Sequence, residues 1–278
     1  MPIPRALAAR LPALHEAQEH QEGCNVLAAD LPELGVEQRT WPNGLRSVRS
    51  TGIPDHQPGN QVMGVGPEHL DDLPAISDWF AEAGCSMHLR WPGPDLDHAT
   101  SQRLAALGLI AHEVEAWMAA PIDELAPEAP DHTILPVDSP ARVEDFLTAF
   151  YGGWSIKSAT SKTVIRGAVG PYPGPDWWRR YVAYVDGEPA GEAVLALFPE
   201  DGVAYLAEAA TVPRFRKRGV QRALIARRIA DARAAGAHTL FGAVQYGDAS
   251  WSNMRALGLR EEFVTVSFRR KAATNPEG

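Results

Sequence analysis

Residues 211–225 decide the fold, and they read Thr-Val-Pro-Arg-Phe-Arg-Lys-Arg-Gly-Val-Gln-Arg-Ala-Leu-Ile. The strand-like run that ends here, residues 203–212, is stopped by Pro213, which has no N–H to donate to a sheet. Beyond Gly219, apolar residues recur on one helical face at Val220, Leu224, Ile225, Ile229 and Ala232. The stretch therefore predicts a strand, a basic turn centred on Gly219 and an amphipathic helix.

This turn has the properties of an anion site. The first N–H groups of a helix lack acceptors within the helix, and the helix dipole adds partial positive charge there. Gly219 lets the backbone approach a bulky anion, and Arg216, Lys217 and Arg218 supply mobile positive charge. We interpret the turn as a pyrophosphate site, although a solvated basic face is the commoner explanation of such a turn taken alone. Neither GxxxxGK[ST] nor GxGxxG is present.

The elements on either side can be predicted as well. Asp186-Gly187 lies between β-rich runs at residues 180–185 and 190–198, which is a strong hairpin signal. Gly236 is expected to end the helix. A strand at 239–244, a short helix at 250–257 and a last strand at 263–268 follow. The predicted order is hairpin, strand, helix, strand, helix and strand.

In this order of elements, residues 132–270 resemble the GNAT acyltransferase superfamily. Arg216 and Gly219 match the motif R/Q-x-x-G-x-G/A that opens the family's central helix, whereas Gln221 departs from it. The hairpin at 181–191 is similar to the family's second and third strands. The segment 253–259 is similar to the N-x-x-x-x-GF entry to the last strand, with Leu259 in place of Phe.

The resemblance implies an α/β (α+β) fold with a mixed, mostly antiparallel central sheet flanked by helices. It implies acetyl-CoA as co-substrate and no metal, with the acyl-CoA bound where the fourth and fifth strands splay apart. The N–H groups of residues 216–221 would hold the pyrophosphate, the backbone of 210–212 would pair with the pantetheine arm, and Asn253 would contact that arm or cap a helix. The expected cofactor-binding residues are Ala210, Thr211, Val212, Arg216, Lys217, Arg218, Gly219, Val220, Gln221 and Asn253.

The usual reaction of the family is direct attack of a primary amine on the thioester, which requires a base because an ammonium cannot attack. Glu208 is the one carboxylate of its apolar strand, so we expect it to be the general base or an anchor for the substrate ammonium, or else an exposed polar residue. The family often protonates the thiolate with a Tyr, and Met254 occupies that position here. Ser252 and Tyr246 are the candidate substitutes, unless the thiolate leaves unaided.

Aromatic residues gather in the sequence before the hairpin. Trp154, Trp177 and Trp178 lie where the family forms a wall of the acceptor pocket, and they could stack on a flat or cationic acceptor. Packing in the core is the competing explanation of these residues.

An internal echo suggests a duplicated domain. Ala83-Gly84 followed by Leu107-Gly-Leu109 is similar to Ala235-Gly236 followed by Leu257-Gly-Leu259, unless the similarity is chance. In the first copy the turn at residues 66–72 reads Gly-Pro-Glu-His-Leu-Asp-Asp, with three acids in place of three bases. We therefore expect a degenerate copy at 1–120, a Pro-rich linker at 121–131, and the catalytic domain with the one active site at 132–278.

Composition limits the function further. The net charge of −9 argues against nucleic-acid binding, although residues 131–278 alone carry 19 basic and 16 acidic residues, or +3. The longest clean apolar run, 193–198, is far shorter than the ~20 residues of a membrane span. The first twenty residues lack the apolar core of a signal peptide, and two cysteines make no disulfide framework, so we expect a cytoplasmic protein.

The leading hypothesis is an N-acetyltransferase for a small-molecule amine that works as a monomer or homodimer without nucleic acid or membrane. The alternatives are a non-catalytic acyl-CoA sensor or scaffold, and another acyl-CoA reaction such as O-acylation or malonyl decarboxylation.

Overall fold

The computed structural model describes residues 32–127, 130–169 and 176–271, which form two compact units. The C-terminal unit comprises residues 117–262, and the N-terminal unit comprises 32–116 together with 263–271. The expectation about a signal peptide falls on residues outside the described ranges. Within those ranges, no helix has both the length and the apolar character needed to cross a membrane.

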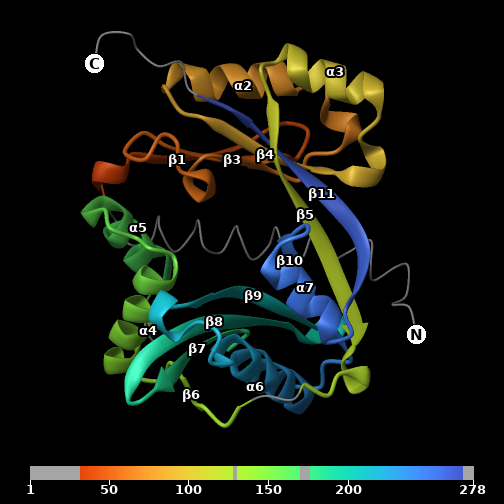
Figure 1. Cartoon of the computed structure of the whole chain (residues 1–278). Helices are drawn as coiled ribbons and strands as arrows, with labels where there is room; N and C mark the ends of the chain where they lie inside the picture. The colour runs from red at the N-terminus through yellow and green to blue at the C-terminus, as the bar shows by residue number, and fades with distance from the viewer. Residues whose placement is uncertain (1–31, 128–129, 170–175, 272–278) are drawn as a thin grey trace. The chain divides into compact units, whose positions relative to one another are not determined.

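The C-terminal unit is a mixed sheet covered by helices (Figure 1). The sheet follows the order β5-β10-β9-β8-β7-β6, with parallel pairing between β9 and β10 and antiparallel pairing from β9 to β6. Its strands are β5 (Ile110–Pro121, from Trp117 onward), β6 (Thr133–Pro136), β7 (Trp178–Val185), β8 (Glu188–Phe198), β9 (Val203–Thr211) and β10 (Thr239–Gln245). Its helices are α4 (Pro140–Gly153), α5 (Ala159–Val169), α6 (Val220–Ala234) and α7 (Ala249–Ala256). The mostly antiparallel sheet expected from the sequence is confirmed.

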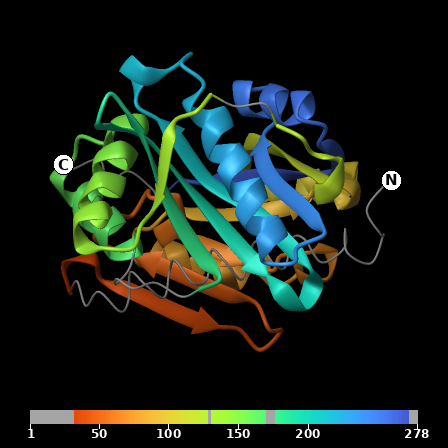
Figure 2. The ribbon, with the colours of Figure 1, turned by 90° about the horizontal axis from the view of Figure 1, so that it is seen from below.

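The β7–β8 hairpin turns at Asp186 and Gly187, whose φ angles of 53° and 80° suit the type of two-residue turn that follows the twist of its strands. Helices α4 and α6 pack on opposite faces of this hairpin. A Cβ on Gly191 would lie 2.8 Å from Val220 of α6, whereas Glu192 accepts a hydrogen bond from Trp154 at the end of α4. Figure 2 shows α6 lying along the strands. Since both faces are covered, β8 is buried along most of its length.

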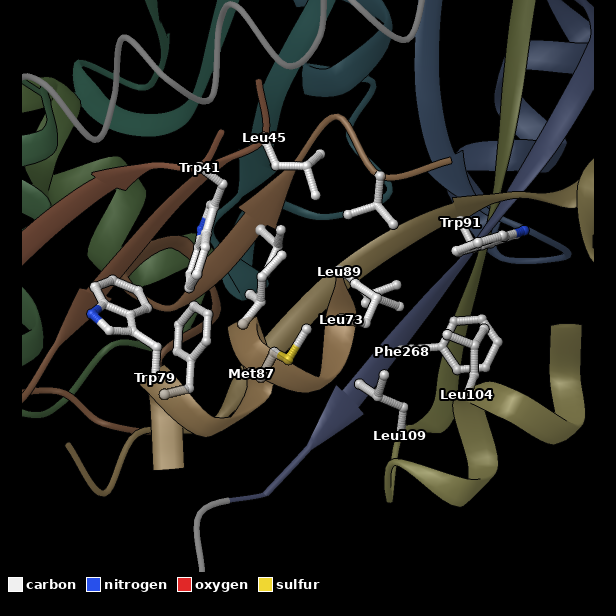
Figure 3. Close-up of a cluster of buried hydrophobic side chains, with 14 of the residues drawn as sticks. Trp41, Leu45, Leu73, Trp79, Met87, Leu89, Trp91, Leu104, Leu109 and Phe268 are labelled. Atoms are coloured by element: carbon white, nitrogen blue, oxygen red, sulfur yellow. The ribbon is translucent and has the colours of Figure 1, made fainter. Parts of the chain in front are cut away.

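The N-terminal unit repeats this plan with shorter strands. Its strands β1 (Val36–Thr40), β2 (Arg46–Ser50) and β3 (Gln61–Met63) are antiparallel, and β3 runs parallel to β4 (Met87–Pro92). Helices α2 (Leu73–Glu82) and α3 (His98–Ala106) cover a core rich in aromatic and large aliphatic side chains (Figure 3). The labelled core residues are Trp41, Leu45, Leu73, Trp79, Met87, Leu89, Trp91, Leu104, Leu109 and Phe268.

The predicted repeat of elements is confirmed. In each copy a helix ends before a glycine of positive φ, and a strand, a second helix, a second such glycine and a last strand follow. The second helices, α3 and α7, begin in the same way, because Asp97 accepts a hydrogen bond from the N–H of Thr100 and Asp248 accepts one from the N–H of Trp251. An aspartate before a helix is a strong N-terminal signal, and it is present in both copies.

The last strand of each copy is divided between the units. In β11 (Arg260–Arg270), the first three residues belong to the C-terminal unit, whereas residues 265–270 pair antiparallel with β4 in the N-terminal unit. Strand β5 is divided in the same way at Trp117, whose ring stacks on Phe241 of β10. Each unit's sheet is therefore completed by residues from the other copy's last strand.

The segment predicted as a linker begins with ordered packing. Ile122 and Leu125 are buried, and the N–H of Ile122 donates to the carbonyl of His238. Arg233 of α6 donates to the carbonyl oxygens of Ile122 and Leu125. The domain limits at 1–120 and 132–278 stay a prediction from the sequence repeat. The compact units differ from these limits, because residues 117–120 belong to the C-terminal unit and residues 263–271 belong to the N-terminal unit.

Candidate active site

The strands β9 and β10 separate after a short parallel ladder. Residues 203–205 pair with 239–241, after which β9 continues to Thr211 and β10 continues to Gln245. The backbone of the second half of β9 is therefore not paired in register with β10 on that side. The splay expected from the family resemblance is present, and it leaves a strand edge to which an extended arm can bind.

Glu208 lies at a bulge in β9. On β8, Ala193 pairs with Ala209 and Val194 pairs with Ala207, so Glu208 is the extra residue between them. A bulge turns a side chain away from regular alternation and is common beside active sites. The residue that the sequence analysis selects as the candidate base therefore lies at the register shift between β8 and β9.

Arg228 of α6 holds this bulge from within the core. Its side chain is 2% exposed, and its Nη1 donates to the carbonyl oxygens of Val194 at 2.9 Å and Ala207 at 3.0 Å. Its Nε donates to the carbonyl of Leu224 at 3.3 Å. Burial lowers the pKa of Arg228 to about 10, so the guanidinium is still charged at neutral pH.

A second carboxyl, Glu192, lies on the same face of the sheet as Glu208. Glu192 pairs with Ala210 and Val194 pairs with Ala207, so the bulged Glu208 lies between two positions of this face, and its charge acts on the Glu192 carboxyl. Arg180 joins this face, because it pairs with Val194, two residues after Glu192. Burial lowers the pKa of Arg180, and the charge of Glu208 opposes that effect.

Glu192 is fully buried, and the protein offers its carboxyl few hydrogen bonds. Its Oε1 accepts a hydrogen bond from Trp154 Nε1 at 3.2 Å, and its Oε2 has no hydrogen-bond partner. Burial, assisted by the charge of Glu208, raises the pKa of Glu192 to about 8. Sequence reasoning missed Glu192, although Glu192 is the one carboxylate of the predicted strand at 190–198, just as Glu208 is the one carboxylate of its strand.

The predicted pyrophosphate turn has the geometry of an anion cradle. Lys217 and Gly219 have φ angles of +63° and +83°, and α6 begins at Val220. The first intrahelical bond runs from the N–H of Ala223 to Gly219, so the N–H groups of residues 220–222 precede the helix ladder. The N–H of Arg216 donates to Pro213 instead, which removes that amide from the predicted set.

Both arginines of the turn, Arg216 and Arg218, have structural partners. Arg216 donates to the carbonyl oxygens of Thr211 at 3.2 Å and Gly153 at 3.3 Å, which ties the turn to the end of α4. Arg218 pairs with Asp186 at 3.0 Å in an exposed ion pair, which contributes little to stability by itself. The side chain of Arg218 can therefore leave Asp186 and bind an incoming anion with little loss of stability.

The other side of the turn is held by the chain that precedes β6. His132 Nε2 lies 2.8 Å from the carbonyl oxygen of Arg218, in hydrogen-bond contact. A Cβ on Gly219 would overlap the ring of Pro130. Gly219 is therefore required both by its positive φ and by this close approach.

Helix α7 brings further predicted residues to the N-terminus of α6. Asn253 Nδ2 lies 3.4 Å from Gln221 Oε1, so the two side chains meet. Asn253 does not cap α7, because Asp248 does. Ser252 donates to the carbonyl of Asp248, and the exposed Tyr246 packs its ring against Trp251.

The three predicted acceptor tryptophans do not form one group in their contacts. Trp154 is 51% exposed and contacts Phe150 and Glu192. Trp177 and Trp178 contact each other, and Trp177 continues through Phe198 into the aromatic core. Of the three, Trp154 is the one with a hydrogen bond to Glu192. Within the described ranges, no three or more His, Cys, Asp or Glu residues gather as metal ligands would.

Comparison with known proteins identifies this domain. Residues 144–259 match the model of the Acetyltransferase (GNAT) family, and no curated protein matches the chain. Membership of that family suggests acyl transfer from acyl-CoA.

The fold of nearly the whole chain occurs in solved structures. A GCN5-related N-acetyltransferase from Kribbella flavida has a TM-score of 0.57 at 19% identity, over 90% of this chain and 94% of that chain. A functionally unknown conserved protein from Staphylococcus epidermidis reaches 0.64 at 14% identity, over 86% and 95%. A tandem GNAT protein from the clavulanic acid biosynthesis pathway reaches 0.55 at 14% identity, over 82% and 78%. At these identities the likeness concerns the fold, and the family model carries the assignment: residues 144–259 are a domain of the GNAT acetyltransferase family.

Proposed function

We propose that this protein is an acyl-CoA-dependent N-acetyltransferase that moves the acetyl group of acetyl-CoA to the primary amine of a small molecule. The observation that carries the proposal is the construction of β9. One strand opens away from β10, presents Glu208 at a bulge, and leads within a few residues into the anion cradle at Gly219. A cofactor site and a base thus lie along one piece of backbone.

The cofactor would lie along the open edge of β9. The backbone of Ala210, Thr211 and Val212 is in position to pair with the pantetheine arm, except that the N–H of Val212 already donates to Ala190. The pyrophosphate would take the N–H groups of residues 217–221 and the side chains of Lys217 and Arg218, with Asn253 beside Gln221.

The transfer balances with one base. The Glu208 carboxylate takes a proton from the acceptor ammonium, and the free amine attacks the thioester carbonyl carbon. The C–N bond forms, the C–S bond breaks, and the second nitrogen proton ends on the sulfur, which leaves as CoA thiol. Met254 is buried and has no proton to give, so Ser252, Tyr246 or water would relay that proton.

The N-terminal unit would not bind a second acyl-CoA. Its corresponding turn carries Glu68, Asp71 and Asp72, and α2 has a proline in its first turn, which removes one N–H. Negative charge at this place repels a pyrophosphate. We therefore propose one active site for each chain and treat the N-terminal unit as a degenerate copy.

Calorimetric titration with acetyl-CoA and CoA tests the cofactor site. We expect one site per chain in the wild type, binding lost in Lys217→Glu, and binding retained in the matched control Lys271→Glu, which changes an exposed lysine elsewhere. Acetyl-CoA-dependent acetylation of primary amines, followed by thiol release and product mass, then tests the reaction. No binding by the wild type overturns the proposal.

A non-catalytic acyl-CoA sensor is the second candidate, and the buried Met254 at the usual acid position favours it. Glu208→Gln separates the two, because a catalyst loses rate but keeps its affinity for CoA. Product mass separates amine acetylation from O-acylation and from decarboxylation of a malonyl thioester.

A further inference from the structure

Glu192 is the buried carboxyl that the proposed reaction does not use. It is 0% exposed and lies in the middle of β8, where α4 and α6 cover both faces. A buried carboxylate needs a cationic partner or several hydrogen bonds. Glu192 accepts a hydrogen bond from the uncharged Trp154, its Oε2 has no direct hydrogen-bond partner, and the backbone of Ala210 has a smaller effect on its pKa than Trp154 has.

The charged groups around Glu192 come from three elements. Arg180 lies on β7, Glu208 on β9 and Arg228 on α6, while α4 contributes the uncharged Trp154. Arg228 directs its Nε and Nη1 to three backbone carbonyls and thereby fixes the bulge that presents Glu208. Its charge acts on Glu192 through space and not through an ion pair formed by those atoms.

We propose that Glu192 and Glu208 form a carboxyl pair that carries a single negative charge at neutral pH, and that Glu192 is a positioning residue which sets the pH range over which Glu208 accepts the acceptor's proton. This inference rests on the proposed function, because it assigns Glu208 the role of base. The pair arises because both residues lie on the face of the sheet that α4 covers, on neighbouring strands.

A shared charge follows from the geometry. Two carboxylates on neighbouring strands repel each other, and the buried one is the costlier to ionise. Glu192 therefore keeps the proton while Glu208 is charged. Once Glu208 has taken the proton of the ammonium, the repulsion on Glu192 is gone. The two groups titrate as a pair, so a change at one must alter the pH response of the other.

The pair can be observed without any activity. In protein labelled with 13C at the glutamate side-chain carboxyl, NMR titration is expected to show one carboxyl whose midpoint lies near pH 8. That signal is absent in Glu192→Gln and moves at least one pH unit lower in Glu208→Gln. A Glu192 carboxyl that titrates with the surface glutamates, or that ignores Glu208→Gln, overturns the shared charge.

The pH dependence of the transfer tests the use of the pair. Glu192→Gln keeps the size of the side chain and an acceptor for Trp154, so the KM for acetyl-CoA is expected to stay within about twofold. We expect the pH–rate limb of Glu208 to move by about one unit, since the coupled neighbour has gone. Glu188→Gln, an exposed glutamate at the start of the same strand, is the control and should leave the profile unchanged.

An unchanged profile in Glu192→Gln overturns the positioning role. A wild type that transfers no acetyl group overturns the proposed function and the catalytic use of the pair together. In that case the NMR titration still decides separately whether the two carboxyls share a charge.

Discussion

The two copies of the fold carry residues of opposite charge in the corresponding turn, the one before α6 and the one before α2. In the C-terminal unit the turn before α6 is basic, Gly219 caps the helix in a left-handed conformation, and α6 buries Arg228. In the N-terminal unit the turn before α2 is acidic, and α2 buries Leu73, Ile76, Ser77, Trp79 and Phe80. The framework of strands, glycines and capping aspartates is kept in both copies, so the framework alone does not make a cofactor site.

Loss of Arg228 is expected to have the largest effect. Arg228→Met removes the donors that hold the carbonyl oxygens at the bulge and removes one of the cations near Glu192, and a buried network broken on one side loses about 3–5 kcal/mol. Arg227→Met is the matched control, because the ion pair that Arg227 forms with Asp231 is partly exposed. Chemical denaturation of both variants checks this, and equal losses would show that Arg228 is not special.

The turn of the C-terminal copy can be tested against that of the first copy. Gly219→Glu introduces a charge and a side chain at a φ of +83°, against Pro130, and we expect acetyl-CoA affinity to fall by about 100-fold or more. Gly66→Glu in the N-terminal unit should leave that affinity unchanged. A calorimetric titration in which Gly66→Glu weakens binding would locate a contribution in the first copy that its acidic turn argues against.

Removal of the base should separate rate from binding. Glu208→Gln is expected to lower kcat by roughly 100-fold, the usual contribution of a general base, with acetyl-CoA affinity within about threefold of wild type. Steady-state kinetics and calorimetry together check this. Parallel losses of rate and affinity would instead assign Glu208 to the cofactor site.

Glu192 predicts an unusual pH dependence of stability. Because its folded pKa is raised to about 8, the folded state holds a proton that the unfolded state releases above its ordinary pKa. Its stabilisation is therefore complete only below about pH 4.5, and it is lost progressively as the pH rises from there through about 8. Between pH 6 and pH 9 wild type should lose roughly 3 kcal/mol more than Glu192→Gln. Urea unfolding at the two pH values measures the difference.

The capping aspartates give the smallest expected effect and probe what the copies share. Asp248→Ala should destabilise by about 1 kcal/mol, because the N–H of Trp251 loses its acceptor. Asp97→Ala should act in the same direction through Thr100. Thermal unfolding checks both, and a cap that matters in one copy alone would contradict the common framework.

Local patterns predicted most of this architecture. The hairpin, the strand before Pro213, the helix from Val220 and the repeat of glycines could all be predicted because each depends on neighbouring residues. The cradle at Gly219 was predictable for the same reason. The position of Glu192 was not, since its meaning depends on Glu208 in another strand and on Trp154 in a helix far away in the sequence.

The contacts of the tryptophans likewise could not be predicted from their neighbours in the sequence. Trp154, Trp177 and Trp178 all precede the hairpin in the sequence. Trp154 nevertheless contacts Glu192, whereas Trp177 packs on Phe198 and so joins the aromatic core. Which face a side chain takes depends on strand register, and register is set by pairing partners distant in the sequence. The division of β5 and β11 between the units is likewise a property of pairing and has no local signal.

The last strand also has a consequence for synthesis of the chain. Phe268 of β11 belongs to the core of the N-terminal unit, beside residues as early as Trp41 and Leu45. A ribosome makes the early residues of that core first but cannot supply its closing strand until almost the whole chain has emerged. The unit that is translated first is therefore completed last. Its folding depends on the synthesis of the second copy, which supplies Phe268.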